Sequence, residues 1–117
     1  MIGELQEARL DGAKLVDSDL GADPANQGMV PVRVDMSRAV LDGADLTRAN
    51  LVHVVLSFAQ LKNAKLVDAR LNWTDLSGAV LEGADVTGAD FTNADLEGTS
   101  LARLKGARAA RGLPASE

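Results

Sequence analysis

The sequence contains no cysteine and no tyrosine, and its 117 residues include only one tryptophan and two phenylalanines. Without cysteine the chain can form no disulfide, no thiolate metal site and no thiol nucleophile. Apolar residues still make up 46% of the chain, but most of them are Ala, Leu and Val. A core with so few aromatic side chains has to be assembled from many small units of similar size.

Positive charge and long apolar runs are also scarce. The net charge is −5, whereas a general nucleic-acid binder needs a basic stripe that displaces counterions. The body is acidic, but residues 102–117 carry four bases and one acid. No apolar run reaches membrane-spanning length, and no basic and apolar signal sequence follows Met1. We therefore expect a cytoplasmic, soluble protein that binds neither nucleic acid nor membrane; whether the chain is part of a longer protein stays open.

A period of five residues dominates the chain. Apolar residues occupy fourteen consecutive positions at a spacing of five, and a small residue stands two positions before most of them. An earlier block, with leucine at positions 5, 10, 15 and 20, repeats the pattern. The fourteen positions are Met36, Leu41, Leu46, Leu51, Leu56, Leu61, Leu66, Leu71, Leu76, Leu81, Val86, Phe91, Leu96 and Leu101.

A five-residue period fits neither an α-helix nor a flat strand. Five residues advance about 500° around a helix, so successive leucines would drift over every face. Along a strand five is odd, so successive leucines would alternate between two sides. A bend after every Ala-x-Leu triplet keeps the leucines on one inner side, and repeated bends wind the chain into a coil. The Asp or Asn before many central residues, and the Gly that often stands two positions after them, favour such bends.

The segments A-D-L-T-R at 44–48 and A-D-L-E-G at 94–98 resemble the A-(D/N)-L-x-x motif of the pentapeptide-repeat family. Eighteen tandem matches, over residues 3–22 and 34–102, carry this resemblance. It implies an all-β solenoid, a right-handed quadrilateral β-helix with four repeats per coil and about four and a half coils. It also implies that each central residue, and the small residue two positions before it, points inward.

We predict a single pentapeptide-repeat domain over residues 1–117. Its first coil covers residues 3–22, and its main solenoid covers residues 34–102. Between them the step from one central apolar residue to the next is sixteen instead of five, and the intervening segment 23–33 contains two prolines and a glycine. We expect this segment to be a loop that leaves a corner between the first and second coils.

The five-residue step fails after Leu101, and residues 102–117 are expected to cap the end of the solenoid. Residues 102–111 are rich in helix formers and are followed by Gly and Pro, which end helices. We therefore predict a short helix near 102–111 that covers the open core. The alternative role is dimerisation through an apolar face formed by Leu104 and Ala107.

Residues twenty apart should stack above one another in such a coil. One outward column contains His53 and Trp73, with Val52 and Val55 on either side of His53 and Phe58 across the adjacent face. An exposed apolar cluster of this kind marks a candidate interaction surface. The inserted loop leaves from the same corner, and its apolar residues either cover this cluster or bind a partner. Those loop residues are Met29, Val30 and Val32.

The sequence offers no catalytic, cofactor or metal site. His53 is the only histidine and no cysteine accompanies it, so neither a metal site nor a nucleophilic triad can be assembled. The repeat accounts for aspartates such as Asp75 and Asp95 as bend formers, and a solenoid filled with leucine leaves no interior pocket. We therefore predict a protein that is not an enzyme and needs no cofactor.

The most direct functional prediction is a protein-interaction or scaffold module with an unknown partner, which also forms a homodimer if an end of the solenoid associates. The family resemblance implies an alternative, because some members mimic DNA and bind DNA gyrase or another type II topoisomerase, in some cases conferring fluoroquinolone resistance. This chain shares their acidic body. It departs from them because it is short, its charge is modest, and Lys62, Lys65 and Arg70 interrupt the acidic faces.

Overall fold

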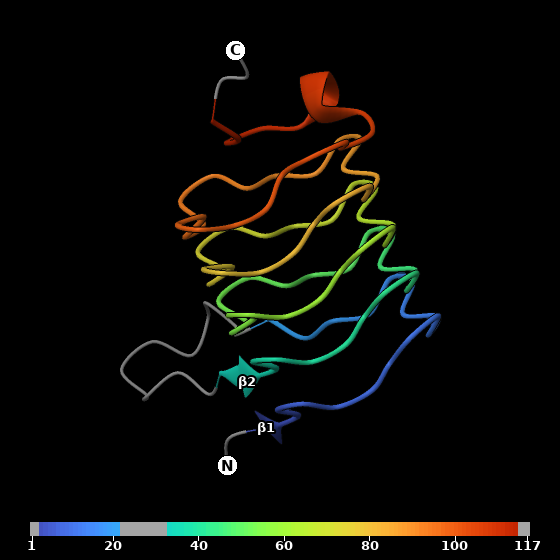
Figure 1. Ribbon diagram of the computed structural model, residues 1–117, viewed down its shortest axis with the longest axis vertical. Coiled ribbons are helices and arrows are strands. Elements are labelled where there is room, and N and C mark those ends of the chain that lie inside the picture. Colours follow the sequence, from blue (N-terminus) through green and yellow to red (C-terminus); the bar gives the residue numbers. More distant parts are fainter. Residues whose placement is uncertain (1–2, 22–32, 115–117) are drawn as a thin grey trace.

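The computed structural model describes residues 3–21 and 33–114, which form one stack of coils (Figure 1). The named elements are short: strands β1 (Gly3–Glu4) and β2 (Val34–Asp35), and a 3-10 helix, η1 (Ala107–Ala109). The two strands pair in parallel. Every other bridge between described residues is also parallel and involves one residue per repeat. The regular secondary structure therefore consists of a repeated parallel ladder and contains almost no helix.

Successive coils pair in a register of twenty residues. Val40 pairs with Gln60, Gln60 with Val80, and Val80 with Ser100. Twenty residues are four repeats, so each coil has four sides, and the ladder that starts at Arg9 passes through five stacked coils. Figure 1 shows the coils stacked along the long axis, with β1 at one end and η1 at the other. The described residues thus form a four-sided parallel β-solenoid, as the repeat predicts.

Each repeat ends in a tight turn. The carbonyl of the central residue accepts a hydrogen bond from the N–H group three positions later, as Leu56 does from Ala59 (3.1 Å). The third residue of the turn has a positive φ, as Phe58 does (59°), which is the conformation that type II turns require at this position. Among the described residues, eleven other than glycine adopt this conformation, at a cost of about 1–2 kcal/mol each. They can do so because the surrounding ladder holds the backbone in place.

Hydrogen bonds between coils have a fixed direction. In most repeats the lower coil, on the N-terminal side, donates two N–H groups to the coil above, as Leu56 does to Asp75 (2.7 Å) and Phe58 to Ser77 (2.9 Å). The upper coil returns one N–H group, as Asp75 does to Val54 (3.1 Å). Interior coils are therefore held from both sides, whereas the first and last coils are held from one side by the described residues.

The core is a stack of inward-pointing side chains. From Met36 to Phe91, the central residues and the small residues two positions before them are 0–1% exposed. Thr74 is the polar residue in this stretch of the core, and its hydroxyl donates a hydrogen bond to the carbonyl of Leu51 (2.7 Å), so its burial leaves no unsatisfied donor. The inward placement of both positions agrees with the sequence prediction.

The outward residues on either side of each central residue form four faces, which we name A to D in chain order. A corner with a left-handed residue lies between each face and the next. The members are residues 4–6, 35–37, 55–57, 75–77 and 95–97 for face A, 9–11, 40–42, 60–62, 80–82 and 100–102 for face B, 14–16, 45–47, 65–67, 85–87 and 105 for face C, and 19–21, 50–52, 70–72, 90–92 and 111 for face D.

The register changes between the first two coils. Arg9 pairs with Val40, 31 positions later, whereas Val40 pairs with Gln60 at the usual twenty. The connection between these two coils is therefore eleven residues longer than that between later coils. The predicted loop over 23–33 falls outside the described residues except for Arg33, and so do its candidate residues Met29, Val30 and Val32.

The C-terminal end differs from the predicted helix over 102–111. Only η1 is helical there, and it is a single 3-10 turn of three residues. The residues before it keep the repeat, because Arg103 takes the left-handed corner position (φ 58°) and Leu104 packs against the core. The predicted capping helix is thus wrong in its extent, and the solenoid continues where the helix was expected.

The rim of the coil below explains this continuation. Its N–H groups need acceptors, and Val86 donates to the carbonyl of Lys105 (2.8 Å) while Phe91 donates to the carbonyl of Arg111 (2.7 Å). These bonds outweigh the helix propensity of the segment. Asp90 pairs with Arg111, 21 positions later, so η1 takes up one extra residue. The solenoid therefore reaches nearly five coils rather than four and a half.

We predict that Leu66→Ala lowers the free energy of unfolding by roughly 2–5 kcal/mol, because Leu66 is fully buried and its truncation opens a cavity in the middle of the stack. The matched control is Leu5→Ala, which removes the same atoms from a side chain that is 40% exposed in the first coil. Urea unfolding of both variants measures the difference. Equal losses for the two variants would contradict this packing.

Candidate interaction surface

Exposed aromatic side chains are the most unusual feature of the solenoid surface. Trp73 is 55% exposed and Phe58 is 58% exposed. Both lie at corners that border face A, Trp73 between faces D and A and Phe58 between faces A and B. Exposed apolar side chains that gather in one region often mark a binding site. Face A with its two corners is therefore the candidate site.

The corner between faces D and A carries His53 and Trp73, one coil apart. Their rings are stacked, with centroids 6.0 Å apart and planes inclined by 15°. The stacking follows from the register, because both residues occupy the left-handed corner position (φ 65° and 61°) twenty residues apart. Nδ1 of His53 is buried and has no hydrogen-bond partner among the described residues. His53 therefore acts here as a flat support for the indole ring.

The corner between faces A and B carries Phe58. The guanidinium group of Arg38, one coil below, lies over the Phe58 ring, 5.7 Å from its centroid. Gly78, one coil above, leaves the space that the ring fills, because a Cβ at this position would lie only 2.5 Å from the ring. The ring is thus held from below and above while its outer side stays open to solvent.

Face A is acidic between these corners. Its second outward column has serine at positions 37, 57 and 77 and Glu97 at the top. No Lys or Arg lies on the described part of face A, and Arg38 at its corner is stacked on Phe58. The face therefore combines two aromatic anchors with a row of carboxylates. The members of its first outward column are Asp35, Val55, Asp75 and Asp95.

The charged columns on the other faces mix the two signs, and the ladder of face C alternates regularly. On face C, acids and bases follow one another along the ladder in the order Lys14, Asp45, Lys65, Asp85 and Lys105. At the corner of the same face, Arg48 binds Asp17 of the first coil through two hydrogen bonds, Nε to Oδ1 (2.7 Å) and Nη2 to Oδ2 (3.1 Å). This hydrogen bonding lowers the pKa of Asp17. Face A therefore differs from face C in carrying charge of one sign.

The residues that the sequence singles out do not all share one surface. His53, Val55, Phe58 and Trp73 lie on face A or its corners, whereas Val52 lies half-buried on face D. The sequence already places Asp75 and Asp95 in one column and accounts for them as bend formers; the structure adds Asp35 to that column. The signal for the row is their spacing of twenty residues, which places them in one column.

The aspartates of the ladder do support the bends. Oδ1 of Asp45 accepts hydrogen bonds from the hydroxyl (2.6 Å) and the N–H group (3.1 Å) of Thr47, and these bonds lower the pKa of Asp45. The backbone N–H of Ser37 lowers the pKa of Asp35 in the same way. Hydrogen bonds from the threonines two positions later also lower the pKa of Asp85 and Asp90. The folded protein therefore favours the ionised form of these carboxyl groups.

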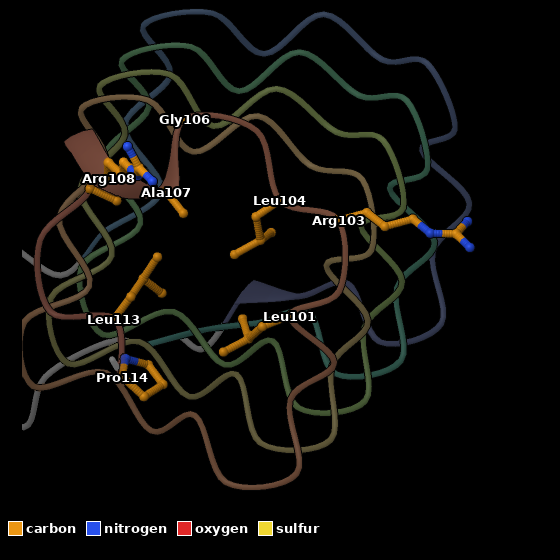
Figure 2. Close-up of a pocket in the computed structure, with 9 residues that line it drawn as sticks. Leu101, Arg103, Leu104, Gly106, Ala107, Arg108, Leu113 and Pro114 are labelled. Carbon is orange, nitrogen blue, oxygen red and sulfur yellow. The ribbon is translucent and has the colours of Figure 1, made fainter. Parts of the chain in front are cut away.

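A second feature is the open C-terminal end, where the core forms a hollow of about 820 Å³ (Figure 2). Leu101, Leu104 and Leu113 point into this hollow, and Arg103 points outward. Ala107 in η1 belongs to its wall. The predicted cap or dimer residues, Leu104 and Ala107, thus lie at the same end, but on a coil and a short turn instead of one helix face.

We predict that stability falls as the pH is lowered from about 5 through the ordinary carboxyl range. The pKa values of Asp35, Asp45, Asp85 and Asp90 are lower in the folded chain than in the unfolded chain, so this stability is present above the unfolded pKa of about 3.9 and is lost below it. Changing all four to Asn should flatten the profile, because Asn keeps an acceptor oxygen and does not titrate in this range.

Asn50 provides the precedent for that variant, since its Oδ1 already accepts the N–H of Val52 (3.1 Å) in an equivalent turn. Urea midpoints at neutral and acidic pH measure the effect. An equally steep acid loss in the variant would show that other carboxyl groups control it.

The repeat region is the part of the chain that matches a known protein family. Residues 32–67 and 64–103 match the family model described as pentapeptide repeats, in eight copies. These two segments together cover more than half of the chain. Among curated proteins, none has a sequence that matches the chain. Within the part of the chain that the structure describes, no helix has the length and apolar character needed to cross a membrane.

Solved structures of the same kind are similar to this one. HetL, a pentapeptide repeat protein involved in the regulation of heterocyst differentiation in the cyanobacterium Nostoc sp. strain PCC 7120, is 33% identical with a TM-score of 0.66. The alignment covers 87% of this chain and 48% of HetL, so the chain spans about half the length of that relative.

Two further solved structures are less similar. Rfr23, a pentapeptide repeat protein from the cyanobacterium Cyanothece 51142, is 25% identical over 92% of this chain and 90% of its own, with a TM-score of 0.45. QnrB1, a plasmid-mediated fluoroquinolone resistance protein, is 23% identical over 92% of this chain and 64% of its own, with a TM-score of 0.32. Of the three structures, only HetL has a TM-score above 0.5.

Proposed function

Because the chain belongs to the pentapeptide-repeat family, we propose that it is a non-enzymatic interaction module that binds a partner protein through face A and its two aromatic corners. The observation that carries this proposal is the pair of exposed aromatic side chains, Trp73 and Phe58, on either side of a row of carboxylates. A rigid solenoid suits such a role, since its side chains are already ordered before a partner arrives.

The backbone at these corners supports a selected role for the aromatic residues. Trp73 and Phe58 both have a positive φ, which glycine adopts freely and other residues adopt at a cost of about 1–2 kcal/mol. Gly78 and Gly98 occupy the same corner as Phe58 in the coils above. More than half of each aromatic side chain remains exposed, so neither ring recovers the full stabilisation of a buried one. A partner that covers the rings would bury their exposed area and provide the remaining stabilisation.

The chemistry of face A indicates the class of partner. Aromatic side chains are frequent anchors of protein interfaces, and carboxylates attract Lys and Arg. Asp75 and Asp95 lie in one column of the ladder, with Glu97 near the top of the face. The partner segment we propose is therefore basic and carries apolar side chains that pack on the rings.

Catalysis is not part of this proposal. The interior of the solenoid is filled by side chains that are 0–1% exposed. The described residues contain no cluster of three metal-ligating side chains. The hollow at the C-terminal end is lined mainly by leucine and alanine, and its charged residues are arginines.

The test is capture from an extract of the host with immobilised protein. We expect Phe58→Ala combined with Trp73→Ala to lose a protein that the wild type retains, because the partner would lose both anchors. Asp75→Asn combined with Asp95→Asn should weaken retention and its dependence on salt. Binding of the captured protein, once purified, is then followed by fluorescence of Trp73, the single tryptophan.

Asn63→Ala is the matched control. Asn63 is an exposed corner residue with a positive φ (61°), and it lies between faces B and C, diagonally opposite Trp73. It should retain the partner as the wild type does. Equal retention by the double aromatic variant would show that face A is not the binding surface.

The DNA-mimic alternative finds no support in the described surface. A mimic needs a continuous negative surface, whereas the column on face C alternates between Lys and Asp along the whole ladder. The TM-score between QnrB1 and this chain is 0.32. We therefore expect no inhibition of DNA supercoiling by purified gyrase at micromolar protein; inhibition at that concentration would revive the alternative.

A further inference from the structure

The two ends of the solenoid complement each other in backbone, core and charge. We propose that the 117-residue chain associates end to end, with the C-terminal rim of one copy on the N-terminal rim of a second copy. This inference concerns the ends of the rod and does not depend on partner binding at face A.

The backbone groups at the two rims match. At the upper rim, the N–H groups of Leu101 and Arg103 donate to no described backbone carbonyl, although their equivalents Leu81 and Gly83, one coil below, donate to the carbonyls of Ser100 and Ala102. At the lower rim, the N–H of Arg9 finds no described backbone acceptor.

The lower rim offers carbonyl acceptors for the N–H donors of the upper rim. In each interior coil, the carbonyls just before and just after the central residue accept N–H groups from the coil below. In the first coil the corresponding carbonyls, such as those of Arg9 and Asp11, accept no described backbone N–H. A second copy stacked head to tail would therefore continue the parallel ladder with the same kinds of hydrogen bond wherever the repeat keeps its register.

The apolar core also ends openly on both sides. Leu101, Leu104 and Leu113 are only partly buried at the C-terminal end and line its hollow. Leu10 and Leu15 are partly buried at the other end, and Leu5 is 40% exposed. The same five-residue repeat builds both ends, although η1 adds one residue to the last coil. Stacking would bury these leucines against one another, as the interior coils do.

The two ends carry opposite charge. Among residues 5–21 of the first coil, four acids outnumber two bases, whereas four bases outnumber two acids among residues 94–114 of the last coil. Head-to-tail contact therefore brings unlike charges together. The bases of the last coil are Arg103, Lys105, Arg108 and Arg111.

A symmetric dimer through the C-terminal end would lack these advantages. It would place Arg103 and Arg108 of one copy near the same residues of the other. The regular part of the upper rim offers two N–H donors, those of Leu101 and Arg103, so two identical rims would face donors with donors there. The asymmetry of the parallel ladder thus favours the heterologous contact, which extends into a chain of copies unless it closes.

Face B is where the ladder would continue most regularly. Leu101 and Arg103 belong to this side, where the repeat holds its register, as the pairing of Val80 with Ser100 shows. η1 interrupts the register later in the coil, between Lys105 and Arg111. The expected contact is therefore weaker than that between two interior coils, and association should depend on concentration.

Sedimentation of the purified chain tests this inference. We expect the weight-average mass of the wild type to rise steadily from micromolar to millimolar concentration, without a plateau at two copies. Added salt should lower it, since it screens the attraction between the ends. A wild type that stays monomeric throughout would overturn the proposal.

Variants that block one end give the sharper result. Leu5→Glu places a charge on the N-terminal rim, and Ala107→Arg places one at the hollow; both residues are exposed, so the fold should survive, which circular dichroism verifies. Each variant alone should be monomeric. Their equimolar mixture should form a 1:1 complex that grows no further, because only one free end of each kind remains. If Leu5→Glu does not fold, Glu7→Lys at an exposed corner replaces it.

The remaining outcomes are also decisive. If Leu5→Glu associates like the wild type while Ala107→Arg is monomeric, the contact is a symmetric C-terminal dimer and the proposal is wrong. If both variants associate like the wild type, the ends are not involved. The variant with Phe58→Ala and Trp73→Ala should assemble normally, which separates this test from that of the proposed partner site.

Discussion

The twenty-residue register of the parallel ladder is the constraint on which this structure depends. It requires each coil to contain four equal repeats, and each repeat to turn at the same residue. Leu56 and Phe58 donate to the coil above, and Asp75 donates back. Because every coil repeats these bonds, one local rule generates the inner stack of leucines, the four faces and the columns of residues on each face.

The same ladder makes the corners usable for functional side chains. A left-handed corner favours glycine, and eight of the described glycines take a positive φ. Trp73, Phe58 and His53 take it too, because hydrogen bonds on both sides hold the backbone in place. The corners thus project large side chains from a rigid frame, and their position relative to face A is set by the register and not by a flexible loop.

Two regions keep exposed apolar side chains or backbone groups without a described partner: the lateral surface and the two ends. On the side, Trp73 and Phe58 remain more than half exposed beside a column of carboxylates. At the two ends, the N–H of Arg103 and the carbonyl of Asp11 have no described backbone partner, and several leucines are only partly buried. The two proposals made for this protein address these two kinds of surface, a basic partner at the side and a second copy at the end.

The local pattern of five residues was sufficient to predict the coil, the inward positions and the turns, because each repeat carries its own small residue, leucine and bend former. It was not sufficient at the C-terminal end, where residues 102–111 look helical by propensity. There the open rim of the coil below, with the N–H of Val86 and Phe91, recruits the segment into a further coil. The repeat places Asp75 and Asp95 in one column, but Asp35 in that column and the exposed rings on both sides of it appear only in the coiled structure. Both outcomes depend on contacts between distant residues, which local propensity does not contain.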